Sequence, residues 1–298
     1  MKNHLLALML VAVAALWGWT FVVVDEAIHA YGVIGFLAVR FTIAAAVMGV
    51  VAARRMSLAT LKVGLAIGVV LAVAYLMQTL GLKYTTPSNC GLITGLFVIF
   101  APLSARLLFG VKTSCKFWVA IAVSLVGIAM LTGAGQEPPS LGDLLTLGCA
   151  ALFGLHIALL GRYAKEHDAF VLTFAQLTTA AVLFMLLWPA SASLWPQAES
   201  LAWPSGRVWF ALIITGVFAS AVAFLVQTYV QKRLPAARTA MILIMEPVFA
   251  AVFGHLLAKT PDERLGAVEV VGAVIMVAAM VLAELSSSDS DGDLSDDR

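Results

Sequence analysis

Long apolar stretches alternate with short polar connections along almost the whole chain. The hydrocarbon core of a bilayer is about 30 Å thick, and a helix needs roughly 20 apolar residues to cross it. Cutting the chain where polar residues, Pro and Gly gather gives ten segments of suitable length. They cover residues 4–24, 31–53, 60–82, 87–109, 116–134, 141–162, 168–189, 207–230, 235–258 and 264–284. The pattern predicts an all-α polytopic membrane protein with ten transmembrane helices.

The composition agrees with this prediction and excludes several classes of protein. Of the 298 residues, 62% are hydrophobic and 12% are charged, whereas about 25% of the residues in a soluble domain are charged. No basic stripe indicates nucleic acid as a partner, and the three cysteines lack the spacing of metal ligands. We expect a monomer or weak homodimer whose partners are the lipid bilayer and a small-molecule substrate, without a cofactor or a metal.

The two ends of the chain need separate interpretation. The start has the lysine and the A-x-A pattern of a secretory signal peptide, but its apolar run continues to Val24 and is long enough to cross a membrane. We therefore expect an uncleaved first helix. Residues 286–298 are acidic and lack core-forming side chains, so they are expected to form a disordered tail.

Lys and Arg are concentrated in every second connection between the predicted helices. The second, fourth, sixth and eighth connections hold Arg54, Arg55 and Lys62; Lys112 and Lys116; Arg162 and Lys165; and Lys232, Arg233 and Arg238. The other connections hold only Lys83, Arg207, Lys259 and Arg264. Cytoplasmic loops of membrane proteins are enriched in Lys and Arg. The distribution therefore predicts a multi-pass protein of the cell (inner) membrane with both termini in the cytoplasm.

The two halves of the sequence resemble each other. The first half contains "YLMQTLGLKYTTPSNCGLITGLFVIFAPLSARLLFG" and the second contains "FLVQTYVQKRLPAARTAMILIMEPVFAAVFG". In each, a Gln-Thr pair ends one helix, a short basic linker follows, and the next helix carries a central proline. Because five helices are an odd number, the second half must enter the membrane from the opposite side. We expect inverted repeats at residues 1–140 and 141–285, an architecture found in many secondary transporters.

Three motifs carry a resemblance to a known family. They are "WGWTFVVV" in the first helix, "QTLGLKYTTPSNCGLITGL" across the third and fourth, and "EPVFAAVFG" in the ninth. With these motifs, the chain resembles the EamA family of the drug/metabolite transporter superfamily over nearly its whole length apart from the tail. The resemblance implies ten helices in two inverted repeats around a central cavity, which moves amino acids, related small metabolites or drugs.

Glu246 and Pro247 interrupt the ninth apolar segment near the expected midplane of the membrane. A carboxylate at this depth costs about 2.5–3.5 kcal/mol on insertion, so it should face the protein interior, be protonated or be paired. Pro247 removes a helical hydrogen bond and should bend the helix, and we expect a matching bend at Pro102. Two interpretations of Glu246 stay open, a substrate and proton-coupling site or a structural carboxylate at a bend.

Arg40 is the second deep charge, in the outer half of the second segment. An arginine stays ionised in a protein, so it needs an anion such as Glu246 or the carboxylate of a substrate. The alternative is a structural arginine that binds backbone carbonyl groups. Arg40 is included among the expected cavity residues.

Other polar and aromatic residues complete the expected cavity. Gln78 and Gln227 occupy matching places near the ends of the third and eighth helices, and Tyr75 and Phe224 precede them by three residues on the same faces. Such amide and aromatic pairs suit an amphipathic metabolite, although amides also bond helices to each other. The remaining expected cavity residues are Trp17, Trp19, Asn89 and His156. A lone histidine is equally typical of a core residue with one hydrogen bond.

Together, the inverted halves, the mid-helix prolines and the isolated deep polar groups indicate a secondary transporter. We expect it to export small metabolites, such as amino acids, by alternating access. A multidrug or toxic-compound efflux protein of the same fold is an open alternative. An intramembrane enzyme is disfavoured, because the segments hold no HExxH, no GxSxG and no second carboxylate near Glu246. A receptor or scaffold would have little use for a duplicated, inverted half.

Overall fold

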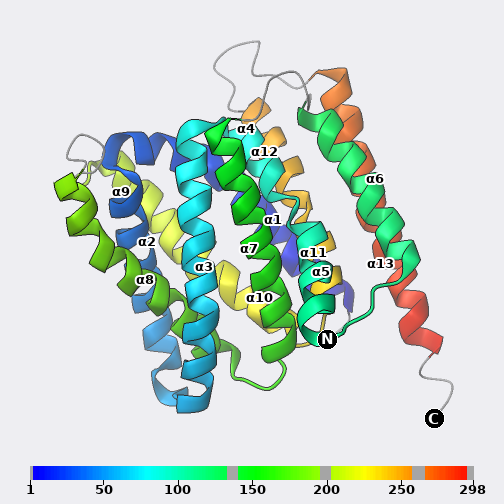
Figure 1. Ribbon diagram of the computed structural model, residues 1–298, viewed down its shortest axis with the longest axis horizontal. Helices are drawn as coiled ribbons and strands as arrows, with labels where there is room; N and C mark the ends of the chain where they lie inside the picture. Colours follow the sequence, from blue (N-terminus) through cyan, green and yellow to red (C-terminus); the bar gives the residue numbers. More distant parts are fainter. Residues whose placement is uncertain (1–2, 133–139, 195–202, 257–265, 294–298) are drawn as a thin grey trace.

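The computed structural model describes residues 3–132, 140–194, 203–256 and 266–293, and all secondary structure in these ranges is helical (Figure 1). The first half contains α1 (Asn3–Tyr31), α2 (Val33–Ala52), the short 3₁₀ helix η1 (Ala53–Arg55), α3 (Leu58–Tyr84), α4 (Pro87–Thr94), α5 (Phe97–Phe109) and α6 (Cys115–Thr132). The second half contains α7 (Leu141–Tyr163), α8 (Ala169–Leu194), α9 (Gly206–Ile213), the π-helix η2 (Ile214–Val222), α10 (Ala223–Gln231), α11 (Ala236–Leu243), α12 (Met245–Leu256) and α13 (Ala267–Asp293).

Within the described ranges, eight helical segments are long and apolar enough to cross a membrane. They are His4–Tyr31, Val33–Arg55, Leu58–Tyr84, Asn89–Phe109, Leu141–Tyr163, Ala169–Leu194, Gly206–Gln231 and Ala236–Leu256. Two shorter apolar helical segments, Cys115–Met130 and Val270–Ala283, overlap the fifth and tenth predicted helices. The prediction of an all-helical, multi-pass membrane protein is confirmed.

Two of the long segments are interrupted near their middle. Between α4 and α5, Gly95 and Leu96 form a turn: the N–H of Leu96 donates to the carbonyl of Ile93, and the carbonyls of Gly95 and Leu96 accept from the N–H groups three positions later, as in a 3₁₀ helix. Between α11 and α12, the interruption is a single residue, Ile244. It comes three residues before Pro247, whereas Pro102 lies inside α5 and not at the interruption of its segment. A turn around Gly95, and not Pro102, therefore divides the fourth segment.

The two interruptions touch each other. A Cβ atom added to Gly95 would lie 2.9 Å from the Cγ of Pro247, which is closer than real Cβ contacts. Gly18 of α1 is tighter still, because its added Cβ would lie 2.7 Å from the carbonyl oxygen of Glu246 and 2.7 Å from the amide nitrogen of Ala250. The first turns of α12 are thus wedged between α1 and the turn after α4.

The remaining helices form layers around this centre. Figure 1 shows α3 and α7 side by side in the middle of the view, α2, α8 and α9 on the left, and α6 with α13 on the right. Close approach again depends on glycines: an added Cβ at Gly64 would lie 2.5 Å from the Cβ of Ala175, and one at Gly127 would lie 2.6 Å from the Cγ of Met276. Small residues permit such contacts between membrane helices.

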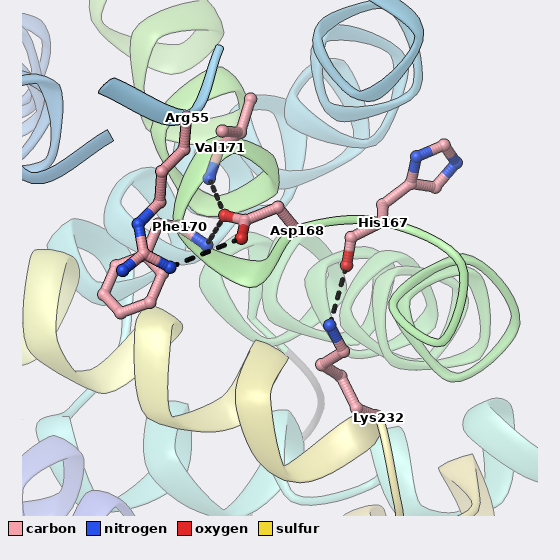
Figure 2. A network of polar contacts seen from close by, with 6 residues as sticks. All are labelled: Arg55, His167, Asp168, Phe170, Val171 and Lys232. Carbon is pink, nitrogen blue, oxygen red and sulfur yellow. Dashed lines mark hydrogen bonds and ion pairs between the residues drawn. The ribbon is translucent and has the colours of Figure 1, made fainter. Parts of the chain in front are cut away.

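The connections that are rich in Lys and Arg all lie at one end of the molecule, which is the lower end in Figure 1. Asp168 organises part of this end, as Figure 2 shows. Its Oδ1 accepts hydrogen bonds from the backbone N–H groups of Phe170 and Val171 at 2.9 and 3.1 Å, so it caps α8. Its Oδ2 lies 3.6 Å from Nη1 of Arg55, whose guanidinium stacks on the ring of Phe170.

A second contact at this end joins two connections that are distant in sequence. Lys232, after α10, donates a hydrogen bond from Nζ to the carbonyl oxygen of His167 at 3.0 Å (Figure 2). The ring Nδ1 of His167 lies 3.1 Å from Oγ1 of Thr60 in α3. These bonds fix the connection between α10 and α11 relative to α3 and the start of α8.

Residues 286–293, the first part of the expected disordered tail, continue α13. α13 continues to Asp293, so residues 286–293 are helical, while residues 294–298 lie outside the described ranges. The physical reason is that an existing apolar helix already provides the costly nucleus, after which each added residue contributes one more backbone hydrogen bond. The composition of residues 286–298 alone carries no information about the helix that precedes them.

We predict that Gly18→Ala lowers the free energy of unfolding by roughly 1–3 kcal/mol, the usual cost of overpacking. The added methyl group would meet backbone atoms of α12, which cannot rotate away. Gly254→Ala is the matched control, since an added Cβ there meets nothing within 4 Å. Reversible unfolding of the purified proteins in mixed detergent micelles measures the difference. Equal unfolding free energies for the two variants would contradict the proposed wedge.

Candidate functional site

A cavity of about 50 Å³ lies among α1, α2, α3, α4, α5, α7, α10, α11 and α12. We call it the central cavity. Its lining consists of Trp17, Thr20, Phe21, Val24, Arg40, Tyr75, Gln78, Thr79, Leu82, Thr94, Phe97, Phe153, His156, Ile157, Phe224, Gln227, Leu243 and Glu246. Eight of the ten residues expected from the sequence are among them: Trp17, Arg40, Tyr75, Gln78, His156, Phe224, Gln227 and Glu246.

Arg40 enters the cavity from α2 and is only 3% exposed. Its Nε donates a hydrogen bond to Oγ of Ser220 at 2.9 Å, and its Nη2 donates one to the hydroxyl of Tyr75 at 3.3 Å. The guanidinium carbon also lies 4.7 Å from the ring centroid of Tyr75, within the range of a cation–π contact. In the described part of the chain, the partners of Arg40 are therefore neutral groups. The side-chain hydroxyls take the place of the backbone carbonyls that a structural arginine was expected to bind.

The π-helix η2 supplies one of these partners and positions another cavity residue. Ser220 lies in η2, and the carbonyl oxygen of Ala219 beside it accepts a hydrogen bond from Nε1 of Trp17 at 2.8 Å. A π-helix is wider than an α-helix and occurs frequently at functional sites. An added Cβ at Gly216 would lie 3.0 Å from the carbonyl oxygen of Arg40, so η2 also packs directly against α2.

Glu246 is 4% exposed and lies in the first turn of α12, directly after the interruption at Ile244. The first N–H groups of a helix have no partner within that helix, and their dipoles favour a negative charge. Within the described ranges, no hydrogen bond or ion pair holds the carboxylate itself. Its surroundings in the cavity are thus a helix start on one side and mainly aromatic and apolar groups on the other.

Arg40 and Glu246 line the same cavity but do not form an ion pair in the described structure. One partner expected for Arg40 from the sequence was Glu246, and the structure does not make that contact. Opposite charges in a low-dielectric space attract strongly even when separated. The central cavity is therefore lined by a guanidinium group and a carboxyl group that are not bonded to each other.

His156 is fully buried in α7 and has one hydrogen-bonded nitrogen. Its Nε2 lies 2.7 Å from Oε1 of Gln176, and Nε2 of Gln176 donates to the carbonyl oxygen of Leu172 at 3.2 Å. Because Oε1 of Gln176 can only accept, Nε2 of His156 must carry the hydrogen. Nδ1 is buried without a partner in the described structure, so it is an acceptor lone pair in the neutral ring.

Aromatic rings form much of the remaining wall. The ring of Tyr75 meets those of Phe153 and Phe224 edge to face, with centroids 5.3 and 6.0 Å apart. Phe224 in turn lies 5.3 Å from Trp17 and 5.7 Å from the ring of His156. This aromatic wall can bind the apolar part of a ligand while Arg40 and the other polar groups fix its orientation.

The two glutamines have different surroundings. Gln78 donates from Nε2 to Oγ1 of Thr94 at 3.3 Å, whereas Gln227 donates to Oε1 of Gln231 at 3.2 Å. Gln231 then donates to the carbonyl oxygen of Ile157 in α7 at 2.8 Å. Oε1 of Gln227 is buried without a partner in the described structure, so it can still accept a hydrogen bond.

Trp19 and Asn89 do not line the central cavity. Trp19 lies two positions after Trp17, about 200° around a helix, so the two rings cannot share one face. Asn89 lies in the first turn of α4, where its backbone N–H donates to Oγ1 of Thr86. The sequence analysis also missed Thr94 and Phe153, which line the cavity, and Ser220, which binds Arg40. Small hydroxyls and phenylalanines are common in membrane helices, and no sequence signal separates these from the rest.

The central cavity is small for a ligand-binding site. About 50 Å³ accommodates roughly three to five water molecules at about 10–15 Å³ each. Pockets for small organic ligands usually measure about 300–1,000 Å³. The central cavity in this structure is therefore smaller than a usual pocket for a small organic ligand.

Comparisons with known proteins place the chain in a family. The EamA-like transporter family matches residues 4–133 and again residues 140–285. An uncharacterized transporter of Archaeoglobus fulgidus is 32% identical over 275 residues, which are 91% of this chain and 85% of that protein. The uncharacterized transporter YyaM of Bacillus subtilis is 23% identical over 68% of this chain and 66% of its own length.

A solved structure described as "Crystal structure of protein" shares the fold, with a TM-score of 0.76 and 20% sequence identity over 95% of this chain and 98% of that one. The two family matches in succession agree with a chain built from two related halves. The chain therefore belongs to the EamA-like transporter family of the drug/metabolite transporter superfamily, and it is a multi-pass membrane transporter and not an enzyme.

Proposed function

We propose that this transporter exports small zwitterionic metabolites, such as amino acids and related amphipathic compounds. The observation that carries the proposal is the presence of Arg40 and Glu246 on the wall of one cavity without a bond between them. A zwitterion has a carboxylate and an ammonium group a few ångströms apart. It can satisfy both side chains at once and has no net charge to carry through the membrane interior.

Each part of such a ligand has a matching group in the cavity. The planar guanidinium of Arg40 suits a carboxylate, with which it can form two parallel hydrogen bonds. Glu246 suits the ammonium group, and the acceptor atoms of His156 and Gln227 provide further sites for its hydrogens. The aromatic wall around Tyr75 suits the apolar side chain of the metabolite.

The transport mechanism in this proposal is alternating access by two inverted repeats of five helices each. The interrupted segments α4–α5 and α11–α12 occupy corresponding places in the two halves. Transporter sites typically form where discontinuous helices meet near the midplane, and half-helix ends contact the substrate there. The narrow central cavity then corresponds to a closed stage of the cycle, which opens to each side in turn.

Glu246 is also the proposed site of proton coupling. The charged and titratable groups that share the cavity with it are Arg40, Tyr75 and His156. Burial disfavours an ionised carboxylate, so Glu246 can take up a proton when the substrate ammonium leaves. Exchange of a proton for substrate would then make export depend on the proton gradient.

Efflux of drugs or other toxic compounds is the second candidate function. The observation that favours it is the aromatic wall of Trp17, Tyr75, Phe153 and Phe224, which suits large apolar cations as well as amino acids. Arg40 separates the two functions, because a lipophilic cation gains nothing from a guanidinium. A panel of amino acids with their decarboxylated amines distinguishes them in a thermal-shift assay, since a ligand of the folded state raises the melting temperature.

We predict that both termini and the basic end of the protein face the cytoplasm. Cys115, at the start of α6 on this end, is the exposed cysteine of the chain, while Cys90 and Cys149 are buried. A membrane-impermeant maleimide added to intact cells should leave the unmodified protein unlabelled and should label a Trp203→Cys variant at the opposite end. Labelling of Cys115 in intact cells would reverse the orientation.

We predict that Arg40→Lys weakens substrate binding about tenfold, since the ammonium group keeps the charge but loses the paired geometry. Transport into proteoliposomes should show a raised KM with a nearly unchanged maximal rate. The decarboxylated amine of the same substrate should bind the parent and the variant equally. A folded variant with the parent KM for the amino acid would exclude Arg40 from the substrate site.

We predict that Glu246→Gln removes the dependence of transport on a proton gradient while substrate exchange continues. The amide has the size and hydrogen-bonding capacity of the protonated acid but cannot release a proton. Counterflow of labelled substrate in proteoliposomes, with and without a pH gradient, measures both properties. A variant with the parent's pH profile would leave Glu246 with only a structural role at the start of α12.

A further inference from the structure

A second and larger cavity of about 500 Å³ lies at the basic end of the molecule. We call it the vestibule. It is bounded by α5, α6, α7 and α11 and by the α5–α6, α7–α8 and α10–α11 connections. The vestibule and the central cavity have no lining residue in common. Its size falls within the range of pockets for small organic ligands, about 300–1,000 Å³.

The charged residues that line the vestibule are all basic. Its basic lining residues are Lys112, Arg162, Lys165, Arg233 and Arg238, and no Asp or Glu is among the described residues that line it. Glu166 lies nearby and pairs with Arg162. This ion pair holds the pKa of Glu166 below its usual range, so that carboxylate stays ionised and offsets one of the positive charges. Lys112, Lys165 and Arg233 are further exposed cations around the same space.

Arg238 is buried, which its contribution to the orientation of the protein in the membrane does not require. Arg238 is 5% exposed, in the first turn of α11, whereas Lys112, Lys165 and Arg233 are exposed. Cytoplasmic loops need Lys and Arg for orientation, but exposed residues satisfy this requirement without any cost of burial. Orientation alone does not explain why an arginine in a helix faces a cavity with four other basic residues.

Hydrogen bonds hold one wall of the vestibule, the α10–α11 connection, in place. Two bonds fix the connection that carries Arg233: Lys232 donates to the carbonyl oxygen of His167 (Figure 2), and Gln231 donates to that of Ile157. The guanidinium carbon of Arg233 lies 5.0 Å from the ring centroid of Tyr229, which restricts the side chain. A site whose groups are already ordered loses less entropy when a ligand binds.

We propose that the vestibule binds a small anion with more than one negative charge, such as a compound or lipid headgroup that carries phosphate. Its lining matches this chemistry, because clustered Arg and Lys bind phosphate oxygens through charge-assisted hydrogen bonds. The hydroxyls of Thr113 and Ser114 add donors, and the side chains of Phe109, Phe117 and Leu234 form an apolar part of the wall. The site differs from the central cavity, where one positive and one negative charge suit a net-neutral zwitterion.

Inorganic pyrophosphate is a suitable probe, since it is small and carries several charges. Isothermal titration of the full chain, purified in a neutral detergent, should give saturable binding with one site per chain. Replacement of two exposed vestibule cations, Lys165→Gln with Arg233→Gln, should weaken it about tenfold or more, as expected for lost charge-assisted hydrogen bonds. The matched control is Arg54→Gln with Lys62→Gln, which removes the same charge from exposed positions at the same end, outside the vestibule. This control should bind pyrophosphate like the parent.

A second arm of the experiment identifies the source of the anion. The same titrations are repeated in nanodiscs of phosphatidylcholine alone and of phosphatidylcholine with phosphatidylglycerol. If phosphatidylglycerol weakens pyrophosphate binding to the parent but not to the vestibule variant, the site is assigned to a lipid headgroup. Unchanged binding in both assigns it to a soluble anion. Arg238→Gln adds a test of the buried cation, with its melting temperature as the measure of folding.

The proposal is overturned by either of two results. One is the absence of saturable pyrophosphate binding in detergent and in both kinds of nanodisc. The other is an equal loss of affinity in the vestibule variant and the control variant, which would show that only the diffuse charge of this end attracts the anion. Neither result depends on transport, so failure here leaves the proposed function of the central cavity unaffected.

Discussion

The position of α12 depends on glycines that face it from two other helices. Gly18 in α1 lets the backbone of α12 approach to contact distance, and Gly95 in the turn after α4 makes room for Pro247. In a bilayer, lipid tails are as apolar as leucine, so helices associate through close packing of this kind and not through the hydrophobic effect. The placement of Glu246 on the cavity wall follows from these contacts, and so does the meeting of the two interrupted segments.

Neutral groups and separated charges then determine the character of the central cavity. Arg40 is held by the hydroxyls of Ser220 and Tyr75, which reduce the cost of its burial without cancelling its charge. Glu246 has the start of a helix beside it, which acts in the same way for a negative group. A direct ion pair would have bound the two groups to each other. The observed arrangement keeps both available, which is the physical basis of the proposed recognition of a zwitterion.

The sequence predicted the parts of this structure that depend on large free energies. Apolar length identified the eight long helical segments and the two shorter apolar ones, because unsatisfied backbone groups are costly in hydrocarbon and a helix satisfies them within one segment. Arg40 and Glu246 were found for a related reason, since an ionised group inside a membrane segment is rare enough to indicate a site. His156 and the two glutamines followed from their polarity within apolar surroundings.

Smaller free-energy differences decided the features that the sequence did not reveal. Ser220, Thr94 and Phe153 belong to residue types that occur throughout membrane helices, so only tertiary packing distinguishes them. The interruption at Gly95 was not expected because Pro102 is the stronger local helix breaker, whereas the close approach of Gly95 to Pro247 is a tertiary contact. Arg238 and the other cations of the vestibule had been used only for orientation. Their convergence on one cavity depends on how four helices and three connections pack.

The direction in which α10 faces depends on the π-helix η2, which lies within the segment Gly206–Gln231. A π turn accommodates more residues than an α turn, so η2 shifts the helical phase between α9 and α10. Each residue of an α-helix corresponds to a rotation of about 100°. If η2 adopted α-helical geometry without losing a residue, α10 would rotate by about this angle or more relative to α9. Phe224 and Gln227 would then turn away from the cavity although no side chain that lines it had been changed.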